Sequence, residues 1–289
     1  MEKKKNRIAL LCLIIFFLLI ALSVLQENNL LPVSNLGVIA IYALIFALPL
    51  LIYRKTQHRK AADFYNLHAF SPRWLPHILV MSLAVSLVCG ALSVVGFLLF
   101  SGAAAKNPTA MMSFSSQSPA VLFITMIFLP ALSEEMLLRG AALSEYESFG
   151  TTRAVVMSAA VFALFHANPT HLLSLFTAGI CYGVMTKLFG SIWPAVIAHM
   201  LNNSLAVLIY NHTALVQNIL SDALFIILAL IALVLILVLA LKMTESAVEH
   251  LGRRGKIRCK KRQGGSMLSF YLLVFALGCI GKMIYTYFL

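Results

Sequence analysis

The chain has 289 residues, of which 61% are apolar and only 11% are charged, and it carries a formal net charge of +12. Soluble globular domains are roughly 45–50% apolar and about 25% charged, so this composition excludes a soluble protein. The apolar runs extend from one end of the chain to the other. We therefore expect an all-α fold, a polytopic integral membrane helical bundle with about eight or nine transmembrane helices.

Nine apolar runs are candidates for these helices. A membrane span needs about 20 mostly apolar residues. Seven runs are close to this length, in chain order Ile8 to Leu25, Leu36 to Tyr53, Ile78 to Phe100, Ala120 to Leu138, Ile192 to Tyr210, Ala223 to Leu241 and Leu268 to Leu289. Two shorter runs, Ala154 to Phe165 and Leu172 to Leu188, need neighbouring helices to cover them. The chain then divides into N-terminal helices over residues 1–118, core helices over 119–210 and C-terminal helices over 211–289.

Most of the positive charge lies in three clusters between the apolar runs. The clusters are Lys3, Lys4, Lys5 and Arg7; Arg54, Lys55, Arg59, Lys60 and Arg73; and Lys242, Arg253, Arg254, Lys256, Arg258, Lys260, Lys261 and Arg262. Alternating spans place all three on one side of the membrane, and the positive-inside rule makes that side cytoplasmic. The opposite loops, at 26–35, 101–118 and 211–222, contain a single basic residue, Lys106. We therefore expect a multi-pass protein of the cell membrane with a cytoplasmic N-terminus.

The basic segment from Lys242 to Arg262 has two interpretations. As a cytoplasmic loop it is a determinant of topology, which is the interpretation we favour. Recognition of anionic lipid or of an acidic substrate tail is the alternative. In either case the basic excess belongs to the membrane topology, and we expect no nucleic-acid partner.

Two adjacent acidic residues, Glu134 and Glu135, lie deep within the fourth apolar run. An ionisable side chain inside a span costs at least about 2.5–3.5 kcal/mol on insertion scales, so such a residue is a functional candidate. Arg139 follows Glu135 by one helical turn, which predicts an ion pair between them. Glu134 points about 100° away around the helix and stays free for chemistry. The alternative is that both glutamates end the helix at the lipid headgroups.

Two histidines and an asparagine are the next polar residues within apolar runs. His166 and His199 both lie among residues typical of a helical core, and Asn203 follows His199 by one turn on the same helical face. Interhelical hydrogen bonds alone would account for either residue singly. The other histidines accompany loops and turns, namely His58, His68, His77, His171, His212 and His250.

Helix geometry allows these groups to meet. If the fourth and fifth helices form a hairpin at Gly150, Glu134 and His166 both lie about 24 Å from its apex. His199 lies roughly 14 Å beyond the next expected turn, at Gly190. The remaining offset of about 10 Å requires helix tilt or an extension of the fourth helix beyond the bilayer.

A carboxylate beside two imidazoles and an amide has the groups needed for hydrolysis. Glu134 would take a proton from water while His166 holds that water, and His199 with Asn203 would donate hydrogen bonds to an oxyanion. Alternatively, Glu134, His166 and His199 would hold a zinc ion with an open position for water. The sequence leaves both routes open.

Three motifs in this order resemble a known family. They are Glu-Glu-x-x-x-Arg from Glu134 to Arg139, Phe-x-x-x-His from Phe162 to His166, and His-x-x-x-Asn from His199 to Asn203. Together they resemble the CPBP (CAAX protease and bacteriocin-processing) family of intramembrane endopeptidases, also called the Abi family. The resemblance covers about Val121 to Leu208 and leaves out the flanking helices.

The resemblance implies an intramembrane endopeptidase that hydrolyses a peptide bond in a membrane-associated protein or peptide. It implies that Glu134 activates water, that His166, His199 and Asn203 complete the catalytic site, and that Glu135 and Arg139 support it. We expect no cofactor, with zinc as the alternative. The expected partners are the substrate and the lipid bilayer, and the sequence assigns no oligomeric state. A non-enzymatic bacteriocin-immunity or scaffold protein is the main competing hypothesis, and a proton-coupled transporter is a weaker one.

Overall fold

A computed structural model describes residues 7–28, 35–57, 60–100, 118–212, 223–253 and 269–288. Over these ranges the chain is helical and contains no strand, as the sequence predicts. Three short segments, α4 (Ala61–Phe64), η1 (Pro72–Trp74) and η6 (Pro169–His171), connect longer helices. The long single helices are α2 (Arg7–Glu27), α3 (Asn35–Lys55), α5 (Leu75–Leu99), α10 (Thr151–Phe165), α11 (Leu172–Phe189), α12 (Trp193–Asn211), α14 (Ala223–Arg253) and α15 (Phe270–Phe288).

The fourth apolar run forms one continuous helix in which α-helical and π-helical turns alternate. Its parts are α7 (Pro119–Leu122), η3 (Phe123–Phe128), α8 (Leu129–Glu135), η4 (Met136–Ala142), α9 (Leu143–Tyr146) and η5 (Glu147–Phe149), and we refer to the whole as the α7–η5 helix. The π-helical segments η3 and η4 flank the two glutamates at the end of α8. Such segments are rare and are frequently found at functional sites.

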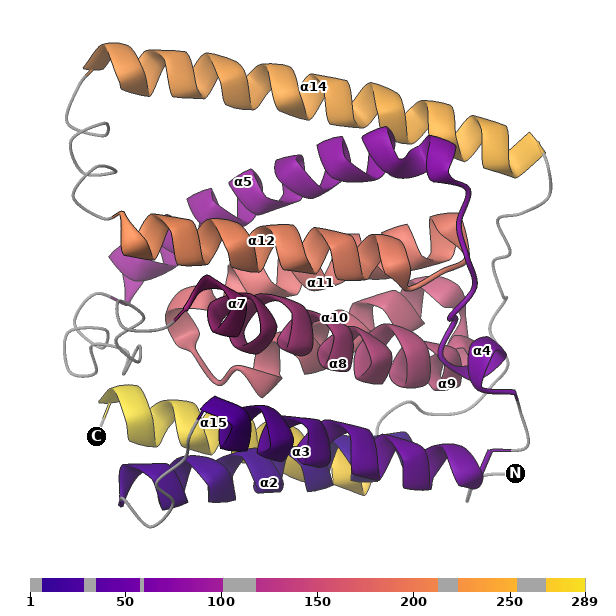
Figure 1. Ribbon diagram of the computed structural model, residues 1–289, viewed down its shortest axis with the longest axis vertical. Coiled ribbons are helices and arrows are strands. Elements are labelled where there is room, and N and C mark those ends of the chain that lie inside the picture. The colour runs from indigo at the N-terminus through magenta and orange to yellow at the C-terminus, as the bar shows by residue number, and fades with distance from the viewer. Residues whose placement is uncertain are drawn as a thin grey trace.

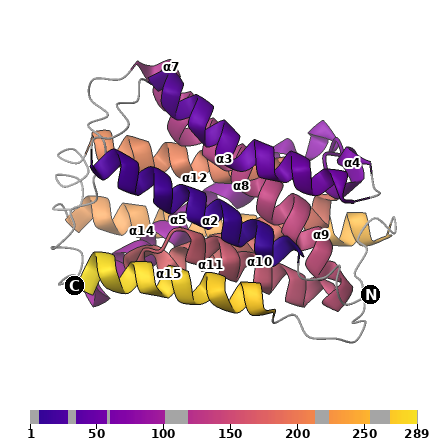
Figure 2. The same ribbon diagram turned by 90° about the horizontal axis from the view of Figure 1, so that it is seen from below.

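The long helices lie side by side and alternate in direction (Figure 1). α2, α3 and α15 form one outer layer, which Figure 2 shows from below, and α5 with α14 forms the opposite outer layer. The α7–η5 helix, α10, α11 and α12 lie between these layers (Figure 1). The chain segments that carry the candidate catalytic residues therefore occupy the middle of the bundle.

Six of the described helical segments are long and apolar enough to cross a membrane. They are Arg7–Leu25, Pro72–Leu99, Pro119–Phe149, Pro169–Phe189, Ala229–Arg253 and Phe270–Tyr287. α10 is apolar but shorter, as the sequence predicts. The chain thus has the structure of a multi-pass membrane protein, and the number of eight or nine spans stays a prediction.

Basic residues gather at the end of the bundle that carries α4. α3 ends there with Arg54 and Lys55, α11 ends there with Lys187 in its last turn, and α14 ends there at Arg253 (Figure 1). This arrangement agrees with the alternation that the sequence predicts. The remaining cluster residues Lys3 to Lys5, Arg59 and Arg254 to Arg262 lie outside the described residues, as do most residues of the three predicted opposite loops.

Two helices extend beyond the predicted apolar runs. The α7–η5 helix continues past Leu138 to Phe149, because its last turns bury the side chains of Leu143 and Tyr146. α14 continues past Leu241 to Arg253, so that Lys242 lies within a helix and not in a loop. The extension of α14 is amphipathic, with buried Ala247 and Leu251 on one face.

α10 and α11 pack unusually closely at Gly179. A Cβ atom at this position would lie 2.8 Å from the Cα atom of Ala159 on α10. Backbone atoms cannot move aside as a flexible side chain does, so only glycine fits. The same glycine lies at the base of the candidate site, where its carbonyl accepts a hydrogen bond from Arg139.

We expect Gly179→Ala to destabilise the protein by about 1–3 kcal/mol, because the added methyl group forces α10 and α11 apart. Thermal unfolding in detergent micelles would measure the change. Gly252→Ala is the matched control, since in the described part of the chain the added methyl group on α14 meets nothing within 4 Å beyond its chain neighbours and its own helix backbone. Equal stability of the two variants would show that the close packing at Gly179 does not constrain the fold.

Candidate active site

Local structure at α8 explains how the α7–η5 helix meets α12. Pro130 has no backbone N–H and cannot donate to the carbonyl oxygen of Met126, four residues earlier. Asn203 on α12 donates its side-chain Nδ2 to this carbonyl at 3.2 Å. The side-chain amide of Asn203 therefore links α12 to the α7–η5 helix. Asn203 lies one turn after His199 on the same face of α12.

A buried ionic cluster lies beneath the site. Glu135 Oε1 accepts hydrogen bonds from Arg139 Nη1 at 2.9 Å and from His199 Nδ1 at 3.0 Å. Glu135 and Arg139 are both 0% exposed, and Arg139 Nη2 also donates to the Gly179 carbonyl at 3.1 Å. The predicted ion pair between Glu135 and Arg139 is confirmed, and His199 is a further member that the sequence did not reveal.

Aromatic rings enclose this cluster. The Arg139 guanidinium carbon lies 4.7 Å from the centroid of the Phe162 ring and 5.3 Å from that of Tyr182. The imidazole of His199 stacks on Tyr182, with the ring centroids 5.4 Å apart. Cation–π contacts stabilise a charge that has lost its water. The rings and Glu135 together fix the orientation of the His199 imidazole.

Glu134 lies apart from this cluster, as its position on the helix predicts. Its Oε1 accepts a hydrogen bond from the Tyr42 hydroxyl on α3 at 3.1 Å. Its Oε2 is buried and has no hydrogen-bond partner among the residues that the structure describes. This oxygen lies 3.9 Å from Nε2 of His166 and 4.0 Å from Nε2 of His199. The structure thus brings together one carboxylate and both imidazoles, from three separate helical segments.

Both imidazoles face Glu134 with the nitrogen that is free to exchange a proton. His166, at the C-terminal end of α10, donates Nδ1–H to the Phe162 carbonyl oxygen at 2.9 Å. His199 donates Nδ1–H to Glu135. The separations from Glu134 exceed hydrogen-bond length, but a water molecule about 2.8 Å from both groups would bridge them. We call this position, between Glu134 Oε2 and the imidazole Nε2 atoms, the water seat.

The same donor atoms allow a test of the zinc alternative. Imidazole and carboxylate are zinc ligands, and each imidazole is oriented by an acceptor on Nδ1, as in many zinc sites. Ligand atoms about 2.0–2.1 Å from a tetrahedral zinc ion are roughly 3.3 Å apart. The observed 3.9 Å and 4.0 Å are wider. Among the described residues, no group of three or more His, Cys, Asp or Glu side chains has the geometry to hold a metal ion.

A cavity of ≈ 150 Å³, which we call the catalytic cavity, adjoins Glu134 and His166. Its other walls include Leu19 on α2 and Tyr42 and Phe46 on α3. The N-terminal helices thus complete the site, and sequence reasoning missed their contribution. A tyrosine hydroxyl within an apolar run was the available signal, since a buried polar group in a membrane requires a partner.

Three other histidines described by the structure have partners of their own. His171 Nδ1 contacts the Ser93 hydroxyl at 3.0 Å, and His68 Nε2 lies 3.3 Å from Asp63. His250 on α14 contacts Arg73 at 3.0 Å. His58 lies outside the described residues. None of these contacts involves Glu134 or Glu135.

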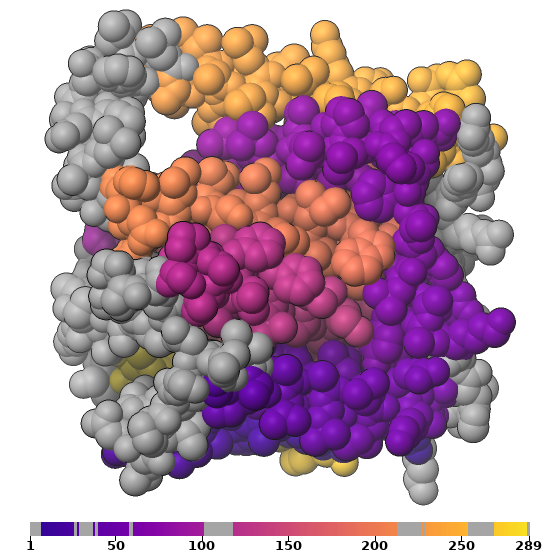
Figure 3. Space-filling model, in the orientation of Figure 1, coloured from indigo at the N-terminus to yellow at the C-terminus, as the bar shows by residue number. Residues whose placement is uncertain are grey.

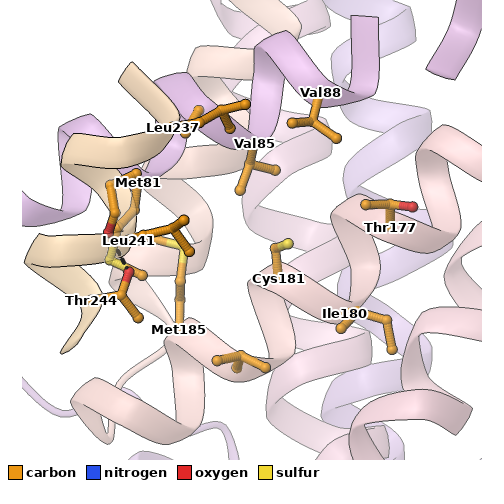
Figure 4. A pocket seen from close by; sticks show the side chains of 13 residues that line it. Met81, Val85, Val88, Thr177, Ile180, Cys181, Met185, Leu237, Leu241 and Thr244 are labelled. Atoms are coloured by element: carbon orange, nitrogen blue, oxygen red, sulfur yellow. Dashed lines mark hydrogen bonds between the residues drawn. The ribbon is translucent and has the colours of Figure 1, made fainter. Parts of the chain in front are cut away.

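A larger cavity of ≈ 290 Å³ lies between α5, α11 and α14 (Figure 4). Side chains such as Met81, Val85, Met185 and Leu241 project into it (Figure 4). Among the described residues that line this cavity, Cys181 is titratable but no Asp, Glu or His is present, so the cavity lacks the carboxylate and imidazoles found at Glu134. We therefore assign the candidate active site to the smaller cavity at Glu134.

In a comparison with known proteins, the middle of the chain is similar to one family. Residues 116–205 match the family described as type II CAAX prenyl endopeptidase Rce1-like. The match confirms the resemblance that the three motifs suggest, and the matched family is one of proteases. No curated protein and no solved structure matches the chain. α2, α3, α5, α14 and α15 lie outside the matched residues, and so does Tyr42.

Proposed function

We propose that this chain, whose residues 116–205 match the Rce1-like family, hydrolyses a peptide bond in a membrane-associated protein or peptide. One observation carries the proposal. A buried carboxylate oxygen of Glu134 accepts no hydrogen bond from the described part of the chain and lies 3.9–4.0 Å from an imidazole nitrogen of each of two histidines. A transporter or a scaffold has no need for this arrangement beside a water seat.

In the proposed reaction, Glu134 Oε2 removes a proton from a water molecule that His166 Nε2 orients. The water oxygen attacks the carbonyl carbon and forms a tetrahedral intermediate. His199, protonated on both ring nitrogens, donates Nε2–H to the resulting oxyanion, and Asn203 donates its second amide hydrogen to it. The carbon–nitrogen bond then breaks, and the proton held by Glu134 passes to the departing amine. Glu135 and Arg139 hold His199 in place throughout.

The assay uses a library of N-terminally palmitoylated peptides, randomised over eight positions and presented in detergent micelles. Mass spectrometry identifies new peptide termini. A subset with a farnesylated C-terminal cysteine tests whether a prenyl group is required. We expect cleavage by the purified protein, and absence of new termini in both sets would refute the proposed function.

We propose further that the reaction requires no metal ion, because the donor atoms around Glu134 are wider apart than zinc ligands. Preincubation with 1,10-phenanthroline is therefore expected to leave the cleavage rate within about two-fold of the untreated rate. Elemental analysis of the active protein accompanies this measurement. Loss of activity that added Zn²⁺ restores would instead assign Glu134, His166 and His199 as zinc ligands.

Tyr42 is proposed to position Glu134, since its hydroxyl holds Oε1 and leaves Oε2 facing the water seat. We expect Tyr42→Phe to lower kcat roughly ten-fold, the usual worth of one hydrogen bond to a charged group, with KM within about two-fold. Tyr285→Phe on α15 is the control, because Tyr285 is 76% exposed. An unchanged kcat, or a change in KM alone, would contradict this role.

The proposed location is the cell membrane, with the N-terminus and the α4 end of the bundle in the cytoplasm. The basic residues at the ends of α3, α11 and α14 support this orientation. The substrate then reaches the site from within the bilayer or from its surface.

A further inference from the structure

His166 lies at the end of its helix, where the backbone is least well held. α10 ends at Phe165, so His166 follows the last helical residue, and its side chain is 33% exposed. On the α10 side, Phe162 holds the imidazole through its carbonyl oxygen and through a ring contact with the centroids 4.9 Å apart. Helix ends fray. A catalytic group at this place therefore needs support from the chain that follows it.

The chain turns sharply directly after His166. Ala167 has a φ of +45°, in the left-handed region that is strained for a residue with a Cβ atom. In the described part of the chain, the one other non-glycine residue with positive φ is Asn66, and asparagine adopts this conformation more readily than alanine. Ala167 is buried, at 2% exposed. Strained backbone of this kind persists where the surrounding structure holds it, and it clusters at active sites.

The next residues form a rigid turn, which we call the His166 turn and define as residues 167–171. The Asn168 side chain accepts hydrogen bonds from the Thr170 N–H at 3.0 Å and from the Thr170 hydroxyl at 2.7 Å. Pro169 fixes its own φ at the start of η6. The turn therefore moves as one unit with the backbone of His166.

α5 holds this turn along one face. Gly96 lies so close that a Cβ atom there would be 1.9 Å from the Thr170 carbonyl oxygen. Three residues earlier, Ser93 Oγ accepts a hydrogen bond from His171 Nδ1–H at 3.0 Å and donates to Ser174 Oγ at 3.0 Å. Ser174 donates in turn to the His171 carbonyl oxygen at 2.9 Å. These three hydrogen bonds form a closed ring that joins α5, η6 and α11.

α5 lies outside the part of the chain that carries the candidate catalytic residues. It precedes residues 116–205, which match the Rce1-like family. It packs against α11, α12 and α14, and it reaches the outer surface of the bundle between the orange α12 and the gold α14 (Figure 3). One helix thus connects this outer surface with the turn beside His166.

We propose that α5, through Ser93 and Gly96, holds the His166 turn and thereby keeps the His166 imidazole at the water seat. The inference rests on the proposed function, in which His166 orients the water molecule. Ser93 and Gly96 act through His166, so they are positioning residues. Once the turn is released, the strain at Ala167 relaxes and the end of α10 frays, which moves the imidazole away from Glu134.

Gly96→Ala tests the close contact. The added methyl group must shift from 1.9 Å to at least 3.0 Å from the Thr170 carbonyl oxygen, a displacement of about 1 Å. Since a misplacement of about 1 Å can cost about 100-fold in rate, we expect kcat on a library peptide to fall at least ten-fold, with KM within about two-fold. Gly90→Ala is the matched control on α5, because its added Cβ meets no described atom within 4 Å beyond its chain neighbours and its own helix backbone.

Ser93→Ala is the milder test, because it releases His171 without adding bulk. We expect kcat to fall about three- to ten-fold, the range for one lost hydrogen bond, and Ser93→Thr to restore it by keeping the hydroxyl group. Hydrogen exchange measured by mass spectrometry reports on the turn itself. The Ala167 N–H, which donates to the Leu164 carbonyl oxygen at 3.0 Å, is expected to exchange at least about three-fold faster in both variants.

Two results would overturn the inference. One is a wild-type kcat in both Gly96→Ala and Ser93→Ala, whatever the exchange rate, and the other is an equal loss of kcat in Gly90→Ala and Gly96→Ala. The proposed function is judged separately, by wild-type cleavage that Glu134→Gln abolishes. Hydrogen exchange needs no substrate, so the two failures are distinguishable.

Discussion

Replacing Glu134 by glutamine is expected to lower the rate of peptide cleavage roughly 10²–10⁴-fold, the usual contribution of a general base. Glutamine has nearly the shape of glutamate, but its amide does not accept a proton from water. The Tyr42 hydroxyl can still donate to the amide oxygen, so the walls of the catalytic cavity remain. Initial rates on a single peptide selected from the library, with the melting temperature measured in parallel, separate catalysis from folding.

The control for this substitution is Glu249→Gln on α14. Glu249 lies on an exposed surface and pairs with Arg253, far along the chain from the site. We expect the control to keep the wild-type rate. A Glu134→Gln variant that retains more than a tenth of the wild-type rate would remove Glu134 as the base.

Replacing Arg139 by leucine is expected to destabilise the protein by about 3–5 kcal/mol, because it leaves the Glu135 carboxylate buried without its cation. Glu135 and Arg139 are both 0% exposed, so no water replaces the lost partner. The Gly179 carbonyl loses its donor as well. A change of this size lowers the melting temperature by roughly 6–20 °C, which thermal unfolding in detergent micelles would detect.

Two further variants establish the cause. Arg153→Leu makes the same substitution at an exposed position on α10 and is expected to change stability by less than about 0.5 kcal/mol. Adding Glu135→Gln to Arg139→Leu removes the unpaired charge and is expected to restore part of the lost stability. If the double variant is no more stable than Arg139→Leu, the destabilisation comes from lost packing against Phe162 and Tyr182.

The helices and one ion pair follow from local sequence, which is why they were predictable. Apolar runs give the helices, and the four-residue spacing of Glu135 and Arg139 gives the pair. The extension of α14 to its basic end was harder to predict. Lys242 interrupts the apolar run of the sequence, but Ala247 beyond it is still buried against the bundle. Helix ends are set by such packing, which a linear pattern does not record.

The meeting of Glu134 with His199 was only partly predictable. Helix lengths left an offset of about 10 Å between them, whereas the structure places Glu134 Oε2 4.0 Å from His199 Nε2. The α7–η5 helix extends to Phe149, as one of the two predicted explanations requires. The contact of Tyr42 with Glu134 spans 92 residues of sequence, and no periodicity within α3 indicates it.

The buried cluster also implies an order of events during synthesis. Glu135 and Arg139 lie in the same helix and neutralise one another as soon as that helix leaves the ribosome, which lowers the cost of its entry into the bilayer. His199 follows Glu135 by 64 residues. At about 5–20 residues per second, the translocon must release α12 on the order of several seconds later. During that interval Glu135 is paired with Arg139 of its own helix and not yet with His199. The ion pair therefore first assists insertion into the bilayer and later holds His199 in the site.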